Sequence, residues 1–133
     1  MRNVLIAAAL VALLPSAPAS AGQMTLEVGY VSTIPIENEA AWRAPYQIGC
    51  ALSYFEYASR DKTARFLVTC TGRRQVYTLQ SGDRIIAAFA QNCRGGCQSL
   101  MIGLHLDELK DDGSVVIDVN AKVVDSPKPA PAS

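Results

Sequence analysis

The sequence lacks most features that would indicate a nucleic-acid binder, a membrane protein or a familiar catalyst. It contains a single histidine, His105, among 133 residues, and its formal net charge is zero. A neutral chain has no global attraction to nucleic acid or to anionic lipid. Its longest apolar run, Val4 to Leu14, is about half of the roughly 20 residues that a membrane helix needs. The sequence therefore predicts no nucleic-acid partner and no membrane span.

The first 21 residues have the pattern of a secretory signal peptide. Arg2 gives a positive start, the apolar run follows, and Ala19-Ser20-Ala21 offers small residues for cleavage before Gly22. The other end, residues 126–133, contains only Ser, Pro, Lys and Ala, which predicts a disordered tail. We therefore expect a signal peptide at 1–21, one β-domain at 22–125 and a tail at 126–133. The expected location is periplasmic or secreted, in a bacterium.

The C-terminal half carries the clearest strand pattern. Folding the chain at Asp112-Gly113, a strong hairpin signal, sets 100–106 against 115–124. Folding it again about Gly95 sets 84–92 against 98–106. Both folds select one apolar face of the shared strand, so a slip of one residue would break their agreement. The expected face consists of Ile86, Ala88, Ala90, Leu100, Ile102, Leu104, Leu106, Val115, Ile117, Val119, Ala121 and Val123.

The upstream half predicts more short strands. A hairpin turning at Arg60 sets Cys50 opposite Cys70, 75–80 forms a strand whose register is ambiguous by one residue, and 24–34 forms another. Between 34 and 46 we expect either a helical turn capped by Asn38 or a long loop. The predicted fold is all-β: a single small antiparallel β-sandwich or open barrel of six to seven strands, with hairpin and meander connections and two disulfides.

The four cysteines allow three disulfide pairings, and an exported chain with an even number of them is expected to form bridges. The hairpin registers favour Cys50–Cys70 and Cys93–Cys97. Redox activity is the first alternative, but thiol oxidoreductases place two residues between their cysteines at a helix start, and here three residues intervene. A zinc site is the second, and the spacing lacks its paired short gaps. Structural disulfides are therefore the prediction.

His105 and Asp107 lie on the polar face of a predicted strand and could orient an imidazole for base catalysis. No nucleophile is identifiable beside them, so we predict no catalytic residues and keep a small enzyme using this pair as an alternative. Acidic residues around the Asp112-Gly113 turn do not match the spacing of an EF-hand calcium loop. No metal and no cofactor are expected.

Basic residues gather between positions 60 and 94, near aromatic ones. Arginine combined with aromatics is typical of protein contact sites, and such a surface could also take polyanions. The expected partner is an envelope or extracellular protein, or a polyanion, and the oligomeric state stays open. The candidate binding residues are Phe55, Tyr57, Arg65, Arg73, Arg74, Tyr77 and Arg84.

Three stretches between residues 81 and 124, about a third of the chain, resemble the β-domain of bacterial secretins, the outer-membrane gates of secretion systems and pili. They are Ser81-Gly82-Asp83-Arg84, Ile102-Gly103-Leu104-His105-Leu106 and the acidic turn with its Val-rich strand, Asp111 to Val119. This resemblance implies an assembly or envelope-accessory role without catalysis. Together, the patterns predict an exported, non-enzymatic binding or envelope-accessory protein that presents a disulfide-clamped sheet face. A secreted enzyme inhibitor fits the same pattern.

Overall fold

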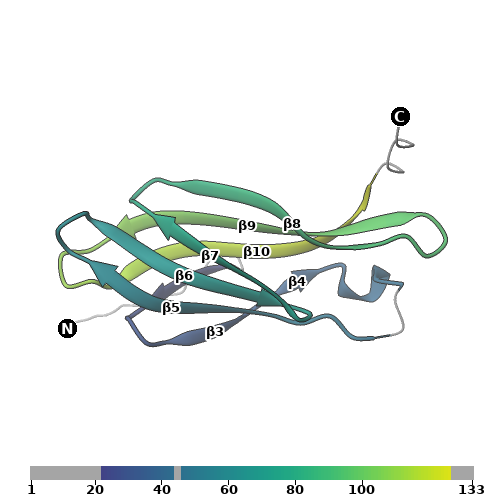
Figure 1. The fold of residues 1–133 in the computed structure, drawn as a ribbon, viewed down its shortest axis with the longest axis horizontal. Helices are drawn as coiled ribbons and strands as arrows, with labels where there is room; N and C mark the ends of the chain where they lie inside the picture. Colours follow the sequence, from purple (N-terminus) through teal and green to yellow (C-terminus); the bar gives the residue numbers. More distant parts are fainter. Residues whose placement is uncertain (1–21, 44–45, 127–133) are drawn as a thin grey trace, which may run out of the picture.

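The computed structural model describes residues 22–43 and 46–126, which form two β-sheets and one short 3-10 helix (Figure 1). This confirms the all-β, two-disulfide fold class, with nine strands in the described part instead of six or seven. The elements are β2 Gln23–Leu26, β3 Val31–Ile34, β4 Ile36–Glu37, η1 Glu39–Ala41, β5 Cys50–Ala58, β6 Thr63–Cys70, β7 Arg73–Leu79, β8 Arg84–Asn92, β9 Cys97–Leu109 and β10 Val115–Ser126.

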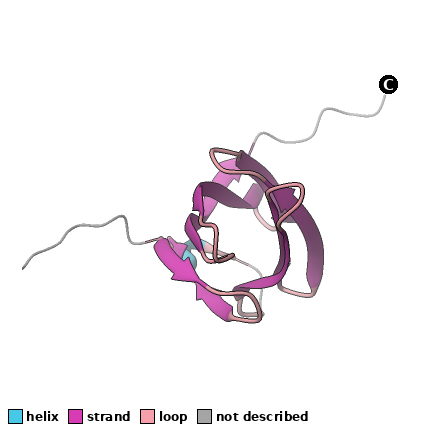
Figure 2. Cartoon of the chain, turned by 90° about the vertical axis from the view of Figure 1, so that its left-hand side faces the viewer, coloured by secondary structure: helices cyan, strands magenta, loops and turns pink. Residues whose placement is uncertain are grey.

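The sheets face each other and enclose the core, as the view along the molecule in Figure 2 shows. One sheet has the order β2-β10-β9-β8, with β4 pairing in parallel beside β10, and the other has the order β3-β5-β6-β7. Every other pairing is antiparallel. Strands β9 and β10 run the length of the molecule (Figure 1). Each sheet therefore has one face in the core and one outer face.

The three-strand meander is confirmed, and so is its apolar face on β9 and β10. The Asp112-Gly113 turn joins them, with Gly113 at φ 91°, and Ser114 donates to the Asp112 carboxylate from its hydroxyl (2.7 Å) and its N–H (2.9 Å). These two bonds, the hydroxyl first, lower the pKa of Asp112. The inward side chains of both strands are buried: Leu100, Ile102, Leu104, Leu106, Val115, Ile117, Val119, Ala121 and Val123.

On β8 the predicted face is right near the turn and wrong beyond it. Ala90 pairs with Leu100 as expected, but a β-bulge at Phe89 shifts the register, so that Ala88 pairs with Met101. Phe89 is buried, while Ile86 is 73% exposed and Ala88 is exposed. The bulge places the Phe89 ring 6.5 Å from the Tyr77 ring of the opposite sheet. Burying this large ring reverses the facing of the first half of β8.

Two expectations for residues 24–46 need correction. The stretch 24–34 is not one strand, because the chain turns at Gly29 (φ 97°) and passes from one sheet to the other. The helical turn is present as η1, but Asn38 makes no side-chain cap and adopts a left-handed φ of 61°. The signal peptide at 1–21 and residues 127–133 of the expected tail lie outside the described residues. Within the described part, no helix has the length and hydrophobicity of a membrane span.

The β5–β6 hairpin has the predicted register: Cys50 lies opposite Cys70, Leu52 opposite Val68 and Tyr54 opposite Phe66. The Cys50–Cys70 disulfide is formed. Tyr54 and Phe66 are fully buried and stack with their centroids 4.9 Å apart. The Tyr54 hydroxyl donates to the Gly113 carbonyl (2.5 Å), which joins this hairpin to the β9–β10 turn of the opposite sheet.

We expect stability to fall in strong alkali because of Tyr54. Burial, with smaller contributions from Tyr57 and Asp112, raises the pKa of Tyr54 from 10.0 to about 12. The unfolded chain then loses this proton at a lower pH than the folded protein does, so the contribution of Tyr54 to the free energy of unfolding is constant below about pH 10 and decreases between there and about pH 12. Burial also raises the pKa of Tyr77, which adds to the decrease.

Urea unfolding at several pH values between 8 and 12 would measure this decrease. The Tyr54→Phe variant should be less stable at pH 8, because a buried hydrogen bond is lost, and should show a shallower decrease above pH 10. Tyr46→Phe, at a half-exposed ring, is the matched control and should reproduce the wild-type slope. An unchanged slope in Tyr54→Phe would assign the alkaline decrease to other groups.

Candidate functional site

The outer face of the β3-β5-β6-β7 sheet carries an uncharged row that crosses all four strands and is apolar on three of them, which we call the apolar row. Val31 pairs with Ser53, Ser53 with Leu67, and Leu67 with Val76, so the four side chains lie side by side. Val31 is 65% exposed and Val76 is 39% exposed, while Leu67 is half-buried. No described element covers them. We call this surface the four-strand face.

The neighbouring row is also poor in charge. It runs through Thr33, Ala51 and Thr69 to Arg74 on β7. These three small or β-branched side chains leave the face flat, and Arg74 places a cation at its β7 edge. A flat, sparsely charged sheet face is suited to contact with another macromolecule.

An arginine and an aromatic ring meet on the other side of the apolar row. Phe55 is the bulged residue of β5 and is 40% exposed. The Arg65 guanidinium lies 5.3 Å from its ring centroid, and Arg65 Nη1 lies 2.8 Å from Glu56 Oε1. The ion pair holds the guanidinium over the ring and cancels its charge. The result is a rigid, partly exposed aromatic and arginine pair of the kind that anchors protein interfaces.

The turn before β3 exposes two further apolar side chains at the end of the sandwich. Its backbone is fixed to β5, because Gly29 N–H donates to the Tyr54 carbonyl (2.7 Å) and Tyr54 N–H donates to the Tyr30 carbonyl (3.0 Å). Tyr30 is 59% exposed, and Val28 beside it is also exposed. The pairing sets Tyr30 opposite Tyr54, one residue out of phase with Val31 and Ser53, so this turn lies at the end of the sandwich and is not part of the four-strand face.

The structure brings together three of the seven candidate binding residues, Phe55, Arg65 and Arg74, on the four-strand face. Arg73 and Tyr77 pair with the inward-facing row of β6 and line a groove of about 320 Å³ against Ala87 and Phe89 of β8, and Arg74 also borders this groove.

The remaining two candidates lie elsewhere. Arg84 begins β8 in the other sheet and pairs with His105. Tyr57 lies at the end of the sandwich, where its hydroxyl donates to the Asp111 carbonyl (3.3 Å) and its ring lies where a Cβ on Gly113 would be. The seven residues therefore do not form one surface.

His105 and Asp107 do meet, on the outer face of the other sheet. His105 Nδ1 lies 2.8 Å from Asp107 Oδ1, and Gln23 Nε2 donates to Asp107 Oδ2 at 3.0 Å. This geometry fixes the ring orientation, but it brings no serine, threonine or cysteine hydroxyl or thiol to the imidazole among the contacts of the described residues. Nor do the described residues contain a group of three or more His, Cys, Asp or Glu side chains able to hold a metal ion.

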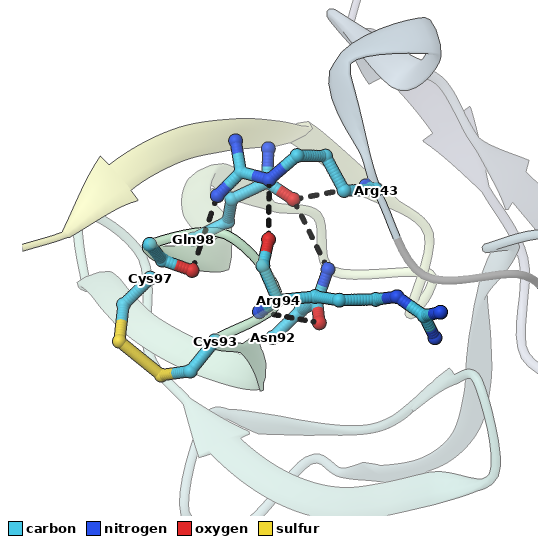
Figure 3. The surroundings of a disulfide bond; sticks show 7 residues. Arg43, Asn92, Cys93, Arg94, Cys97 and Gln98 are labelled. Carbon is cyan, nitrogen blue, oxygen red and sulfur yellow. Dashed lines mark hydrogen bonds between the residues drawn. A yellow bond between two sulfur atoms is a disulfide. The ribbon is translucent and has the colours of Figure 1, made fainter.

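The second disulfide, Cys93–Cys97, closes the tip of the β8–β9 hairpin (Figure 3). Arg43, from the segment after η1, donates from Nε to the Arg94 carbonyl (2.8 Å) and from Nη2 to the Gly96 carbonyl (3.2 Å). The buried Gln98 side chain accepts from Arg43 N–H (3.0 Å). The tip is thus tied to the rest of the sandwich by a cation, and no cysteine of the chain is free. Two disulfides are typical of an extracytoplasmic protein.

Sequence reasoning missed Val31, Leu67 and Val76, the apolar part of the four-strand face. The Cys50–Cys70 register already contained the signal for Leu67, because it places Phe66 and Val68 inward and hence Leu67 outward. Val76 was hidden by the one-residue ambiguity of β7. Val31 was hidden because the chain switches sheets at Gly29, which a continuous strand pattern does not reveal.

Comparison with family models, with curated proteins and with solved structures finds no match for this chain.

Proposed function

We propose that this is an exported, non-enzymatic binding protein that docks a partner protein of the cell envelope or the extracellular space on the four-strand face. The observation that carries the proposal is the uncovered row Val31, Ser53, Leu67 and Val76 across four strands. Val31 and Val76 are exposed at the two edges of this row with the half-buried Leu67 between them, and an exposed apolar patch on a sheet often marks a contact site. Phe55 under Arg65 supplies the anchor beside the row.

The Cys50–Cys70 disulfide and the charges on the four-strand face indicate what kind of partner surface would fit it. The buried Cys50–Cys70 bridge joins β5 and β6, the two central strands of the sheet, so the face is held rigid before contact. A rigid face loses little conformational entropy on binding. Because Glu56 neutralises Arg65, Arg74 is the cation that this face offers, and we infer an apolar partner patch with an acidic group at the β7 edge.

Charge reversal at two adjacent arginines tests which side of β7 binds. The oxidised chain serves as bait for periplasmic and extracellular extracts, and captured proteins are quantified by mass spectrometry. Arg74→Glu should lower the yield of the specific partner about tenfold, because a desolvated charge contact becomes repulsive. Arg73→Glu, the matched control, makes the same change in charge on the groove side and should keep the wild-type yield.

A second pair of variants tests the apolar row itself. The double variant that combines Val31→Glu and Val76→Glu should abolish capture of the partner. It should leave the fold intact, since both side chains are exposed. Ile86→Glu, at the most exposed large apolar side chain of the opposite sheet, is the control. Equal capture by the row variant and by wild type would refute the four-strand face as the docking surface.

A further inference from the structure

Strand β8 has a free edge. It is the last strand of its sheet, pairs with β9 on one side and with no described strand on the other, and lies at the margin of the molecule (Figure 1). Leu106 N–H donates to the Asp83 carbonyl. Alternation along an antiparallel ladder then directs the backbone N–H and C=O groups of Arg84, Ile86 and Ala88 away from β9, toward the free edge.

This edge carries little of the charge by which proteins protect the free edges of their sheets. The free edge of β7, in the other sheet, begins with two arginines, Arg73 and Arg74. Between its start and the bulge at Phe89, β8 has one charged residue, Arg84, and its Ile86 side chain is 73% exposed. An exposed apolar edge is a template for pairing with another strand.

The bonding groups of the edge are arranged symmetrically about Ile86. When two copies of β8 pair in antiparallel fashion with Ile86 opposite Ile86, Arg84 of each copy lies opposite Ala88 of the other. Every outward N–H and C=O of these residues then has a partner, and the two exposed isoleucine side chains lie side by side. The two Arg84 side chains stay at opposite ends of the pairing, whereas a parallel, in-register pairing would set them next to each other.

Asp83 provides a negative charge just before β8. Because its carbonyl accepts from Leu106 N–H, Asp83 continues the row of β8 that faces the opposite sheet, together with Ile85 and Ala87. Its side chain is exposed, and Oδ2 accepts from Gln80 N–H (2.8 Å). Its other oxygen, Oδ1, makes no hydrogen bond or ion pair within the described residues, so it can meet a cation of a second molecule.

A positive charge lies where the same pairing would bring Asp83. With Ile86 opposite Ile86, Asp83 of one copy lies opposite Phe89 of the other. Phe89 lines the groove of about 320 Å³ together with Arg73 and Arg74, and neither arginine forms an ion pair among the described side chains. Each copy therefore brings an acid to the basic groove of the other, and the two-fold axis produces this contact twice.

We propose that two copies of this chain associate through antiparallel pairing of their β8 edges, centred on Ile86. The strands β10-β9-β8 of one copy then continue into β8-β9-β10 of the second copy as one sheet. The pairing uses the edge of the sheet that does not carry the four-strand face, so the inference does not depend on the proposed docking of a partner protein.

Sedimentation velocity of the oxidised chain, from micromolar to millimolar concentration, tests the proposal. The mass should rise from that of one chain to that of two and then stop, because a two-fold contact is closed. Hydrogen exchange at the Arg84, Ile86 and Ala88 amides should slow as the dimer forms. A chain that stays monomeric throughout, that forms larger assemblies, or that associates while these amides exchange at the monomer rate would overturn the proposal.

A lysine at the centre of the edge should prevent association. Ile86→Lys should fold, since the side chain is exposed, and should stay monomeric where wild type is dimeric, because the pairing would set two lysines opposite each other. It should still capture the partner protein like wild type. Val31→Lys, the same kind of change on the edge strand β3 of the other sheet, is the matched control and should dimerise. The reverse result would place the contact between copies on the four-strand face.

The charge contact tests the register of the pairing. Asp83→Asn retains an acceptor for Gln80 N–H and should weaken dimerisation about fivefold, because each dimer loses two exposed ion pairs. Asp61→Asn, at an exposed acid in the β5–β6 turn, is the matched control and should leave the dissociation constant of the dimer unchanged. Equal dissociation constants in Asp83→Asn and wild type would refute the pairing centred on Ile86.

Discussion

Replacing Phe66 with alanine should remove about 3–5 kcal/mol from the free energy of unfolding, the usual cost of deleting a buried aromatic ring. Phe66 is fully buried on β6 and stacks on Tyr54 at 4.9 Å. The cavity would open between the two sheets and beneath the hydrogen bond from Tyr54 to the Gly113 carbonyl. Since whole domains are stable by about 5–15 kcal/mol, this single change should leave a marginally folded protein.

Urea unfolding followed by fluorescence of the single tryptophan, the buried Trp42, measures this loss. Leu67→Ala is the matched control, because Leu67 is the next residue on the same strand and faces outward. It should cost less than about 1 kcal/mol, as surface substitutions do, yet weaken partner capture. Similar losses of stability in both variants would mean that the two faces of β6 are not distinguished as core and surface.

The sequence was sufficient where a local signal fixes the register. Asp112-Gly113 determines the β9–β10 turn, and the Cys50–Cys70 pair determines which residues of β5 and β6 point inward. Both signals act between neighbouring strands, so no knowledge of the second sheet was needed. For this reason the burial of Tyr54 and Phe66 and the outward position of Leu67 could be derived from the pattern alone.

The sequence was insufficient where one sheet decides the structure of the other. Phe89 forms a bulge because its ring reaches Tyr77 across the sandwich, and this contact turns Ile86 to the outside. The alternation of inward and outward residues expected along β8 gives no indication of that contact. The same shift is what places Ile86 opposite Gly103. Likewise, Arg73 and Arg74 look equivalent in sequence, and only the pairing of β7 with β6 separates them.

Removing the Cys50–Cys70 bridge should cost about 3 kcal/mol, and removing Cys93–Cys97 about 2 kcal/mol, because the loop released in the unfolded chain is longer for the first pair. The sequence separations are 20 and 4 residues. The variants are Cys50→Ala with Cys70→Ala and Cys93→Ala with Cys97→Ala, both measured by urea unfolding against the oxidised wild type.

Removing one disulfide or the other should differ more in its effect on partner capture than in its effect on stability. Cys50–Cys70 joins the central strands of the four-strand face, so its loss should reduce partner capture even at a temperature where the variant is folded. At the hairpin tip, the Arg43 bonds to the Arg94 and Gly96 carbonyls remain after the second bridge is removed, and this tip lies far from that face along the molecule (Figure 1). Capture should therefore survive in the second variant. The reverse order, with the tip bridge controlling capture, would place the docking surface at the hairpin end.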